Sequence, residues 1–319
     1  MTPVTTPYPD RASWLKARRR GIGGSDVPAI LGISPWGTPL KVWTEKVGLA
    51  AETEDSYTLR RGSHMEGLLA GELERAIELT VADDSVIASV DWEPGLRRIA
   101  QHGEFPWLLY SPDTFVSVRD VKTRAETRAL GEFKSHPRGA SEWTHDVPAH
   151  VRAQVQHGLD VCDLRTAYVG VDLGTEFRWA RIDRDDAWIA ETRPKLAEFW
   201  LLVEHETPPV PTGDEGDKAA LAAMYPREAG EKVIALPDDL LEAAQRLDEL
   251  AASRRAIEAE ESAIQNRARA ALADAGRGVL PDGSGWTWQT QSRVVMVKDP
   301  GGAIAESRAL RRFQARKER

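Results

Sequence analysis

The chain has 319 residues, 41% of them hydrophobic, and a formal net charge of -8, so it is long enough for one large domain with an appendage or for two domains. This composition excludes a disordered protein, and no apolar run approaches the length of a bilayer span. The N-terminus lacks the apolar core of a signal peptide, and the single Cys162 excludes an internal disulfide and a cysteine-based zinc or iron–sulfur site. These features predict a cytoplasmic protein with no membrane segment.

Residues 14–31 predict a short helix, a glycine-rich turn and the start of a second helix, which Gly32 is expected to close. Ser25 or Asp26 suits the N-cap of the second helix. Backbone amides at such a helix start bind anions, and arginines just upstream can supply bidentate phosphate contacts. Those arginines are Arg18, Arg19 and Arg20. In the alternative interpretation, which stays open, Ser25 only caps the helix and the arginines are solvated.

Residues 61–79 predict a helix whose buried stripe includes Leu69, Leu73 and Ile77. Glu66 lies one turn before this stripe, near the predicted start of the helix. An acidic residue in that position often does no more than complement the helix dipole. It can equally be a carboxylate that points into a site, and the local sequence leaves both roles open.

Six short segments rich in β-branched or aromatic residues, each bounded by turn residues, predict strands. They are residues 86–92, 107–110, 115–118, 129–133, 167–173 and 177–182. This pattern predicts a largely antiparallel sheet with helices packed on it, which is an α/β or α+β core.

The fourth strand carries Glu132 and Lys134 two residues apart, so both side chains point to one face while Phe133 points to the other, into a core. Asp113 follows a Ser-Pro turn. If Asp113 belongs to the same hairpin, two carboxylates and a lysine converge, which is the minimum set for metal-assisted phosphodiester hydrolysis. Taken alone the pattern is weak, because Glu-x-Lys arises about once by chance in a chain of this size and Ser-Pro-Asp commonly opens turns.

Residues 148–159 predict a helix with Val151, Val155 and Leu159 on its buried stripe. Gln154 lies close beside that stripe, where an amide needs a partner. If the helix faces the hairpin, Gln154 can hydrogen-bond the attacking water or a metal-bound carboxylate. The alternative is that it caps the backbone of a strand.

Two other groups of residues receive less weight. Four histidines have spacings that do not match a zinc helix, so loop or surface positions are favoured. They are His136, His145, His150 and His157. Most tryptophans lie in apolar stretches and are predicted to be core, whereas Trp36 and Trp143, in loops, are the better candidates for contact with DNA.

The chain after residue 206 is predicted to be separate from the first domain. Residues 207–232 are rich in proline and glycine and predict a linker, and residues 233–319 predict a helical segment, a β-hairpin and a basic tail. Residues 286–290 and 294–297 would form the two strands of the hairpin, with a turn between them. The basic tail is expected to be a solvated end rather than a DNA contact.

The long helix predicted at residues 240–272 carries Leu250, Ile257 and Ile264 at intervals of seven. Arg254 and Glu261 interrupt the companion row, whereas a sustained dimeric coiled coil needs both rows apolar. We therefore expect this helix to pack on its own chain, with self-association as the less favoured option.

Five motifs follow one another within residues 11–205. They are Trp14-Leu15-x-x-Arg18 with Gly23-Gly24-Ser25-Asp26, then Gly62-x-x-x-Glu66, Ser111-Pro112-Asp113, Glu132-x-Lys134 and Gln154-Val155-Gln156. In this order they resemble the YqaJ-type viral recombinase family, relatives of phage lambda exonuclease among the PD-(D/E)xK nucleases. The resemblance implies a restriction-endonuclease-like core at residues 1–206, with a central mixed sheet flanked by helices. It extends only loosely to a C-terminal helical and β-hairpin appendage.

The same resemblance implies a Mg²⁺-dependent exonuclease, with Mn²⁺ as a possible substitute. Such an enzyme degrades linear double-stranded DNA from its 5′ end and leaves 3′ overhangs for phage-type recombination, together with a single-strand annealing protein. Asp113 and Glu132 would bind the ion with the main-chain carbonyl of Phe133. Lys134 would orient the attacking water and stabilise the phosphate charge. Glu66 would complete the metal shell or hold a second ion.

The remaining implied roles are support of the site by Gln154 and binding of the terminal 5′ phosphate by Arg18 and Ser25. The residues expected beside that phosphate are Arg19, Arg20 and Gly24. Two alternatives stay open: a structure-specific endonuclease on the same core, and a recombination factor that binds DNA ends without cleaving them. A homo-oligomer is possible, and the residues do not decide this.

Overall fold

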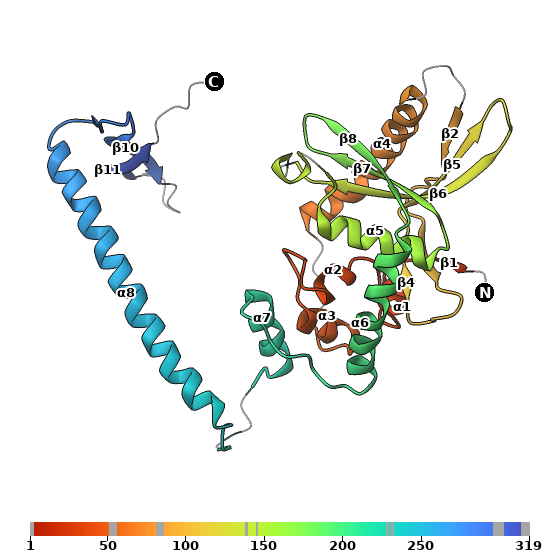
Figure 1. The fold of residues 1–319 in the computed structure, drawn as a ribbon, viewed down its shortest axis with the longest axis horizontal. Coiled ribbons are helices and arrows are strands. Elements are labelled where there is room, and N and C mark those ends of the chain that lie inside the picture. Colours follow the sequence, from red (N-terminus) through yellow and green to blue (C-terminus); the bar gives the residue numbers. More distant parts are fainter. Residues whose placement is uncertain are drawn as a thin grey trace. The chain divides into compact units, whose positions relative to one another are not determined.

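The computed structural model describes residues 3–50, 56–80, 86–137, 140–144, 146–227, 230, 233–295 and 303–313. The chain divides into two compact units, Met1–Ala229 and Gly230–Arg319 (Figure 1). Across the described ranges, no helix is long and apolar enough to cross a membrane.

The first unit is built on a five-stranded sheet in the order β2-β5-β6-β7-β8. The strands are β2 (Val86–Val90), β5 (Thr114–Asp120), β6 (Glu126–Ser135), β7 (Thr166–Asp172) and β8 (Phe177–Asp183). Strands β6 and β7 are parallel, and the other neighbours are antiparallel. The predicted α/β fold class, a mixed central sheet flanked by helices with a helical and hairpin appendage, is confirmed.

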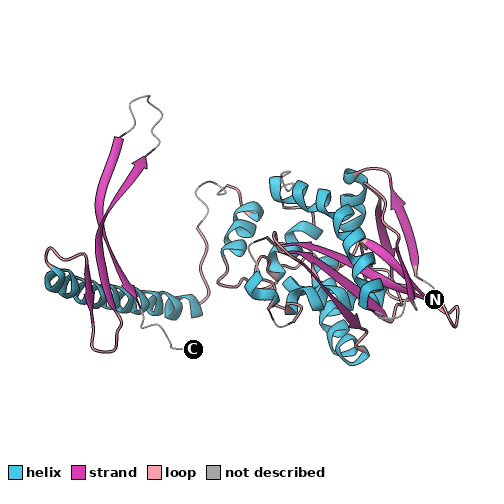
Figure 2. Ribbon diagram, turned by 90° about the horizontal axis from the view of Figure 1, so that it is seen from above, coloured by secondary structure: helices cyan, strands magenta, loops and turns pink. Residues whose placement is uncertain are grey.

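Helices cover both faces of this sheet (Figures 1 and 2). On one face, α4 (Tyr57–Thr80) packs Leu73 and its neighbours against Phe133 and Tyr168. On the other face, α5 (Ala149–Val161) packs Val155 and Leu159 together with Leu130 of the sheet, beside α6 (Asp186–Glu204). Alternation along β6 therefore puts Phe133 on the α4 side, as predicted, and Glu132 on the α5 side.

Helix α4 begins at Tyr57, whereas the sequence predicted a start near Arg61. Glu66 is therefore in the third turn, too far from the helix start to complement its dipole. The mixed polar residues of the first turn hid that start, because they show no apolar period. Arg61 donates a hydrogen bond to Asp172 of β7 at 2.8 Å and thereby ties the helix that carries Glu66 to the sheet.

The N-terminal elements form a second layer. They are β1 (Val4–Tyr8), α1 (Arg11–Arg18), α2 (Val27–Ile30) and α3 (Pro39–Lys46). Strand β1 joins β3 (Arg97–Gln101) and β4 (Leu109–Tyr110) in a three-stranded sheet. The sequence did not predict β1 or β3, because β1 is exposed and contains a proline while β3 begins with two arginines, so neither shows an apolar alternation.

The predicted linker contains a helix, α7 (Glu215–Met224), which packs against α3. Its buried Asp217 accepts hydrogen bonds from Thr38 and from the hydroxyl of Thr212 at 2.7 Å. Residues 215–224 are therefore part of the first unit. The proline and glycine residues around them obscured a helix of only ten residues.

The second unit consists of α8 (Asp239–Leu272), β9 (Arg277–Val279), β10 (Gly285–Val295) and β11 (Ala303–Phe313). The unit contains a hairpin, formed by β10 and β11, but the predicted pairing of residues 286–290 with 294–297 is wrong, because β10 continues through residues 291–293 to Val295 and pairs with β11. Met296 and Val297 lie outside the described residues. So do Arg316, Lys317 and Arg319, whereas the other tail arginines, Arg308, Arg311 and Arg312, belong to β11.

Helix α8 is unbroken, and most of its described side chains do not pack on the described remainder of the second unit. Among its described side chains only Leu272 is buried, and Leu250, Ile257 and Ile264 are 49%, 59% and 48% exposed. Arg254 and Glu261 interrupt the companion row, so the apolar stripe of the helix is only one row wide.

Candidate active site

The β5–β6 hairpin brings the three central predicted residues together. Asp113 directly precedes β5, and its Oδ2 accepts a hydrogen bond from the amide of Phe133 at 2.7 Å. Glu132 is only 1% exposed, and Lys134 Nζ lies 2.5 Å from its Oε1. The pairing of Thr114 with Gly131 sets this register. Both carboxylates and the ammonium are therefore fixed by the hairpin itself.

Two further side chains complete the hydrogen-bonding of Glu132. Gln154 of α5 donates from Nε2 to Glu132 Oε1 at 2.6 Å, and its own Oε1 accepts from Lys134 at 3.0 Å. Tyr110, at the end of β4, donates to Glu132 Oε2 at 2.5 Å. Gln154 therefore faces the hairpin, which the sequence had left as a condition, whereas Tyr110 was not foreseen beside these residues.

Tyr110 is held in place by close packing against two glycines. A Cβ at Gly158 of α5 would lie 2.6 Å from Tyr110 Cζ, and one at Gly24 would overlap the same ring and lie 3.1 Å from Gln154 Cγ. Only glycine therefore fits at either position without moving the ring. Gly24 belongs to the predicted phosphate-binding turn, so this turn lies directly beside the carboxylate cluster.

The buried cluster carries more negative than positive charge. Burial raises the pKa of Asp113 well above its usual range, and the charges of Glu132 and Glu66 raise it further, against the opposing charge of Lys134. Burial also raises the pKa of half-buried Glu66, which receives a hydrogen bond from Trp92 and feels the charge of Glu132. Glu66 thus approaches the cluster from α4, on the other face of the sheet.

The two donors next to Glu132 keep their protons at neutral pH. Burial opposes the charge of Lys134, but Glu132 and Asp113 raise the pKa of its ammonium above the usual value. Burial and then the charge of Glu132 raise the pKa of the Tyr110 hydroxyl well above its usual range. Lys134 is therefore an ammonium and Tyr110 a neutral hydroxyl donor.

The donor chemistry of this cluster fits a hard divalent cation, which carboxylate and carbonyl oxygens bind in preference to other ions. Burial is the main cause of the raised pKa of both Asp113 and Glu66, and the charge of Glu132 adds to it, so a bound cation would favour the charged form of both carboxyls. Within the described part of the chain, however, no three His, Cys, Asp or Glu side chains already surround one ion position. An ion would therefore have to compete with Lys134 and Tyr110 for the oxygens of Glu132.

The N-terminal turn contains a second polar cluster. Arg18 donates to Ser25 Oγ at 2.6 Å, and its guanidinium lies 4.7 Å above the ring centroid of Trp14. Buried Asp26 accepts from the amide of Gly23 at 2.7 Å and pairs with Lys46 Nζ at 2.5 Å. The side chain of Ser25 is exposed, so the Arg18–Ser25 pair is accessible to a ligand.

Two expectations for this turn need correction. Asp26 occupies the N-cap position of α2 but makes no capping bond with its side chain, because the amide of Gly23 and Lys46 hold that side chain. Helix α2 has only four residues, so its dipole is too small to bind an anion alone. Gly32 closes the helix at φ 69°, as predicted. Arg19 and Arg20 are exposed at the end of α1.

The histidines and tryptophans differ in role. His157 is buried, and its Nε2 contacts the carbonyl oxygen of Leu109 at 2.9 Å, which is a structural role. Trp143 is 8% exposed and belongs to the core, so the prediction that it contacts DNA is wrong. Its polar neighbours suggested a loop, but residues 140–143 form a short 3₁₀ helix that packs inward. Trp36 is 59% exposed. His145 lies outside the described residues.

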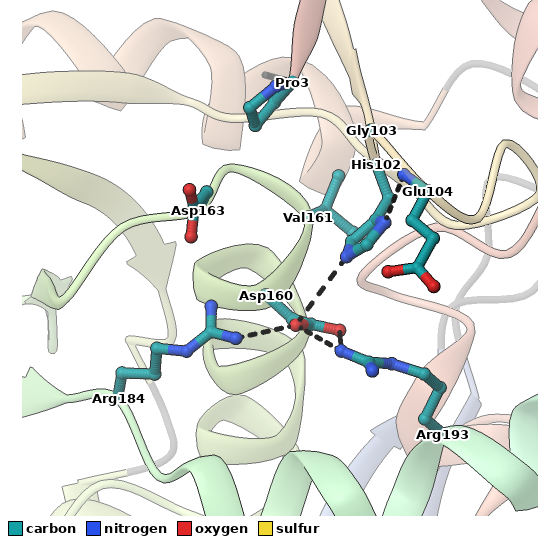
Figure 3. Close-up of a pocket in the computed structure, with 9 residues that line it drawn as sticks. All are labelled: Pro3, His102, Gly103, Glu104, Asp160, Val161, Asp163, Arg184 and Arg193. Carbon is teal, nitrogen blue, oxygen red and sulfur yellow. Dashed lines mark hydrogen bonds and ion pairs between the residues drawn. The ribbon is translucent and has the colours of Figure 1, made fainter. Parts of the chain in front are cut away.

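A separate pocket of about 180 Å³ lies at the far end of α5 (Figure 3). There the buried Asp160 pairs with Arg184 at 2.8 Å and with Arg193 at 2.7 Å, and His102 lies 3.9 Å away. Because one carboxylate engages both arginines, this cluster joins α5, α6 and the β3–β4 loop. It contains none of the predicted site residues.

Residues 13–165 match the model of a protein family described as the YqaJ-like viral recombinase domain. Protein YqaJ of Bacillus subtilis (strain 168), itself described as uncharacterized, is 31% identical over 195 residues, which are 60% of this chain and 55% of that protein. Residues 13–165 are thus similar to the YqaJ-like viral recombinase domain. The resemblance inferred from the five motifs is confirmed, and the chain spans about half the length of this relative.

An alkaline exonuclease (LHK-Exo) from Laribacter hongkongensis is 17% identical, with a TM-score of 0.45 over 62% of this chain and 94% of that chain. A phage related exonuclease from Haemophilus somnus 129PT is 11% identical, with a TM-score of 0.38 over 58% of this chain and 94% of that chain.

The YqaJ-like domain contains every element of the candidate active site. Helix α1, the Gly23–Asp26 turn, the β5–β6 hairpin and all of α5 lie within residues 13–165, apart from the first two residues of α1. Helix α6 and the second unit lie beyond its end. The residues that form the candidate active site therefore belong to the part of the chain that matches the family model.

Proposed function

We propose that this protein is a metal-dependent deoxyribonuclease that digests linear double-stranded DNA from its 5′ end and leaves 3′ single-stranded overhangs for recombination. One observation carries the proposal. Asp113, Glu132 and Lys134 converge on one hairpin, with Gln154 across from them and the Arg18–Ser25 turn alongside. A hydrolytic centre beside an anion-binding turn suits a strand that carries a terminal phosphate.

The proposed ion is Mg²⁺, with Mn²⁺ as a substitute, held by Asp113, Glu132 and the carbonyl of Phe133, and completed by Glu66. When bound, it supplies an acidified water and neutralises charge at the scissile phosphate. Lys134 carries its ammonium 2.5 Å from Glu132, where it can stabilise negative charge that develops on the phosphate.

The other residues of the site orient the reacting groups. Gln154 and Tyr110 bond the two oxygens of Glu132 and so hold this carboxylate in one orientation. Arg18, already directed at Ser25, offers a planar donor fork for a terminal 5′ phosphate. The exposed Arg19 and Arg20 add positive charge nearby, and Gly24 lets the turn approach the cluster closely.

The direct test uses a linear duplex with a 5′ phosphate on one end and a 5′ hydroxyl on the other. With Mg²⁺ we expect nucleotides to be released from the phosphorylated end and a 3′ overhang to accumulate, and we expect chelation by EDTA to stop the release. Supercoiled circular DNA in the same reaction separates the alternatives. Cleavage of the circle would favour the endonuclease, and retention of labelled ends without any cleavage would favour the end-binding factor.

Replacing Arg18 with alanine is expected to remove the preference for a 5′-phosphorylated end, because the guanidinium that faces Ser25 is the proposed phosphate contact. Loss of one charge-assisted contact of this kind corresponds to roughly a tenfold to hundredfold lower kcat/KM on the phosphorylated end. The 5′-hydroxyl end should be affected much less. Arg11→Ala, at the exposed start of α1, is the matched control. An equal fall on both ends would remove the phosphate assignment.

Partners follow from the same proposal. A nuclease that produces 3′ overhangs needs a single-strand annealing protein to use them, and we propose that the chain acts with such a protein in the cytoplasm of the cell that contains the DNA. The exposed apolar side chains of α8 are the proposed contact if the chain forms a homo-oligomer.

A further inference from the structure

Three aromatic side chains from separate parts of the first unit meet beside the candidate active site. The Trp36 ring lies 4.9 Å from the ring of His150 at 90°, and 6.1 Å from the ring of His136 at 73°. Trp36 belongs to the connection between α2 and α3, His136 follows β6 directly, and His150 is in the first turn of α5. We refer to these three residues as the aromatic cluster.

The aromatic cluster is adjacent to Lys134 along two elements. His136 follows Lys134 by two residues at the end of β6. His150 precedes Gln154 by four residues on α5, so both side chains lie on one face of that helix, and Gln154 itself bonds Lys134 at 3.0 Å. Burial lowers the pKa of His150, and the charge of Lys134 acts on it in the same direction. Trp36, which packs against both histidines, is therefore at the Lys134 side of the site.

Trp36 is both exposed and held in position. It is 59% exposed, although large aromatic side chains are normally buried. Both histidines meet its ring edge-to-face rather than stacking on it. The backbone is fixed, because the amide of Trp36 donates to Ser34 Oγ at 3.2 Å and its carbonyl accepts from Lys41 Nζ at 3.2 Å. A rigid exposed indole is the arrangement that aromatic stacking of a ligand requires.

We propose that Trp36, supported by His136 and His150, is a stacking site for an unpaired nucleobase at the DNA end. The inference rests on the proposed nuclease function and assigns the substrate part next to the scissile phosphate. Every nucleobase has a flat π-face, so stacking binds a strand without regard to its sequence. A base attached to a phosphate at Lys134 would lie within reach of the Trp36 indole. By stacking on this unpaired base, the indole would keep it apart from the opposite strand.

The test measures DNA binding without cleavage, in the full chain with Glu132→Gln. The probe is a fluorescently labelled duplex with a short unpaired 5′ end, and the readout is anisotropy. Trp36→Ala is expected to bind roughly 5- to 150-fold more weakly, the range for loss of one stacked base. Trp36→Phe should restore most of the affinity. Tyr225→Ala, which removes another exposed aromatic residue, is the control and should bind like the parent.

An abasic nucleotide placed in turn at each unpaired position distinguishes stacking from a structural effect. At one position the abasic nucleotide should weaken the affinity of the parent by the same factor as Trp36→Ala does. The affinity of Trp36→Ala should not fall further there, because the indole that stacks on this base is already absent. Equal affinity of Trp36→Ala and parent, or equal losses at every abasic position, would overturn the stacking assignment. If either result is found while the chain with Glu132 intact still cleaves DNA, only the stacking inference is wrong. If no variant binds DNA and the chain with Glu132 intact does not cleave it, the nuclease proposal itself is wrong.

Discussion

Replacing Lys134 with alanine is expected to lower kcat for nucleotide release from linear duplex DNA by about 10²- to 10³-fold, the usual effect of removing one group that stabilises transition-state charge. Glu132→Gln should be at least as damaging, because the amide keeps the shape but removes the charge that pairs with Lys134 at 2.5 Å. Nucleotide release under excess substrate, with Mg²⁺ and with Mn²⁺, measures both variants.

Thermal unfolding of each variant separates lost chemistry from lost structure. Glu132 is buried, so Lys134→Ala leaves a carboxylate whose remaining donors are Gln154 and Tyr110, and some loss of stability is expected. Glu132→Gln should unfold near the parent temperature while remaining inactive. Lys218→Ala, at an exposed position of α7, is the control for loss of a lysine. Release at the parental rate by both Lys134→Ala and Glu132→Gln would remove the assignment of the site.

The sequence predicted the central residues of the site because their geometry is local. Glu132 and Lys134 share a face through strand alternation alone, and Asp113 joins them because β5 and β6 form one hairpin. Gln154 was predicted conditionally, since an amide beside an apolar helical stripe needs a partner, and the structure supplies Glu132 as that partner.

Contacts between distant segments were not predictable in the same way. In the sequence Tyr110 resembles any other apolar strand residue, and its hydrogen bond to Glu132 depends on tertiary packing that places its ring against Gly24 and Gly158. A sharper signal was available, since a tyrosine in a fully buried strand needs a partner for its hydroxyl. Trp143 shows the reverse error, because polar neighbours in the sequence do not reveal a ring that turns into the core.

The second unit shows where periodicity misleads. In α8 the spacing of Leu250, Ile257 and Ile264 suggested a packed face, but within the second unit these three side chains stay about half exposed. A row of apolar residues indicates that a helix has a partner without saying which one. In β10, polar residues 291–293 suggested a turn, whereas pairing with β11 through Val295 keeps them in a strand.

Replacing Lys46 with methionine is expected to lower the free energy of unfolding by about 3–5 kcal/mol at pH 7, the usual result of removing one partner of a buried ion pair. Lys46 Nζ lies 2.5 Å from Asp26 Oδ2, and the two side chains are only 4% and 7% exposed. Methionine keeps the apolar length of the side chain, so lost packing contributes little. Denaturant unfolding measures the change. Adding Asp26→Asn should recover much of it, because no buried charge then remains without a partner.

The stability difference between the parent and Lys46→Met should depend on pH, whereas a loss caused only by a cavity would not. Burial alone would raise the pKa of Asp26, but the charges of Lys46 and Arg18 hold it below the usual value, so in the parent its contribution is present above about pH 4 and is lost as pH falls through the folded pKa. Without Lys46 burial dominates, the pKa rises, and the destabilisation develops as pH rises above about 4. The stability difference between parent and Lys46→Met should therefore shrink from pH 7 toward about pH 4. A difference that is constant with pH would mean that Asp26 is not the group left without a partner.

Because Asp26 also holds the amide of Gly23, the same variant should weaken the preference for a 5′ phosphate at the adjacent Arg18–Ser25 pair.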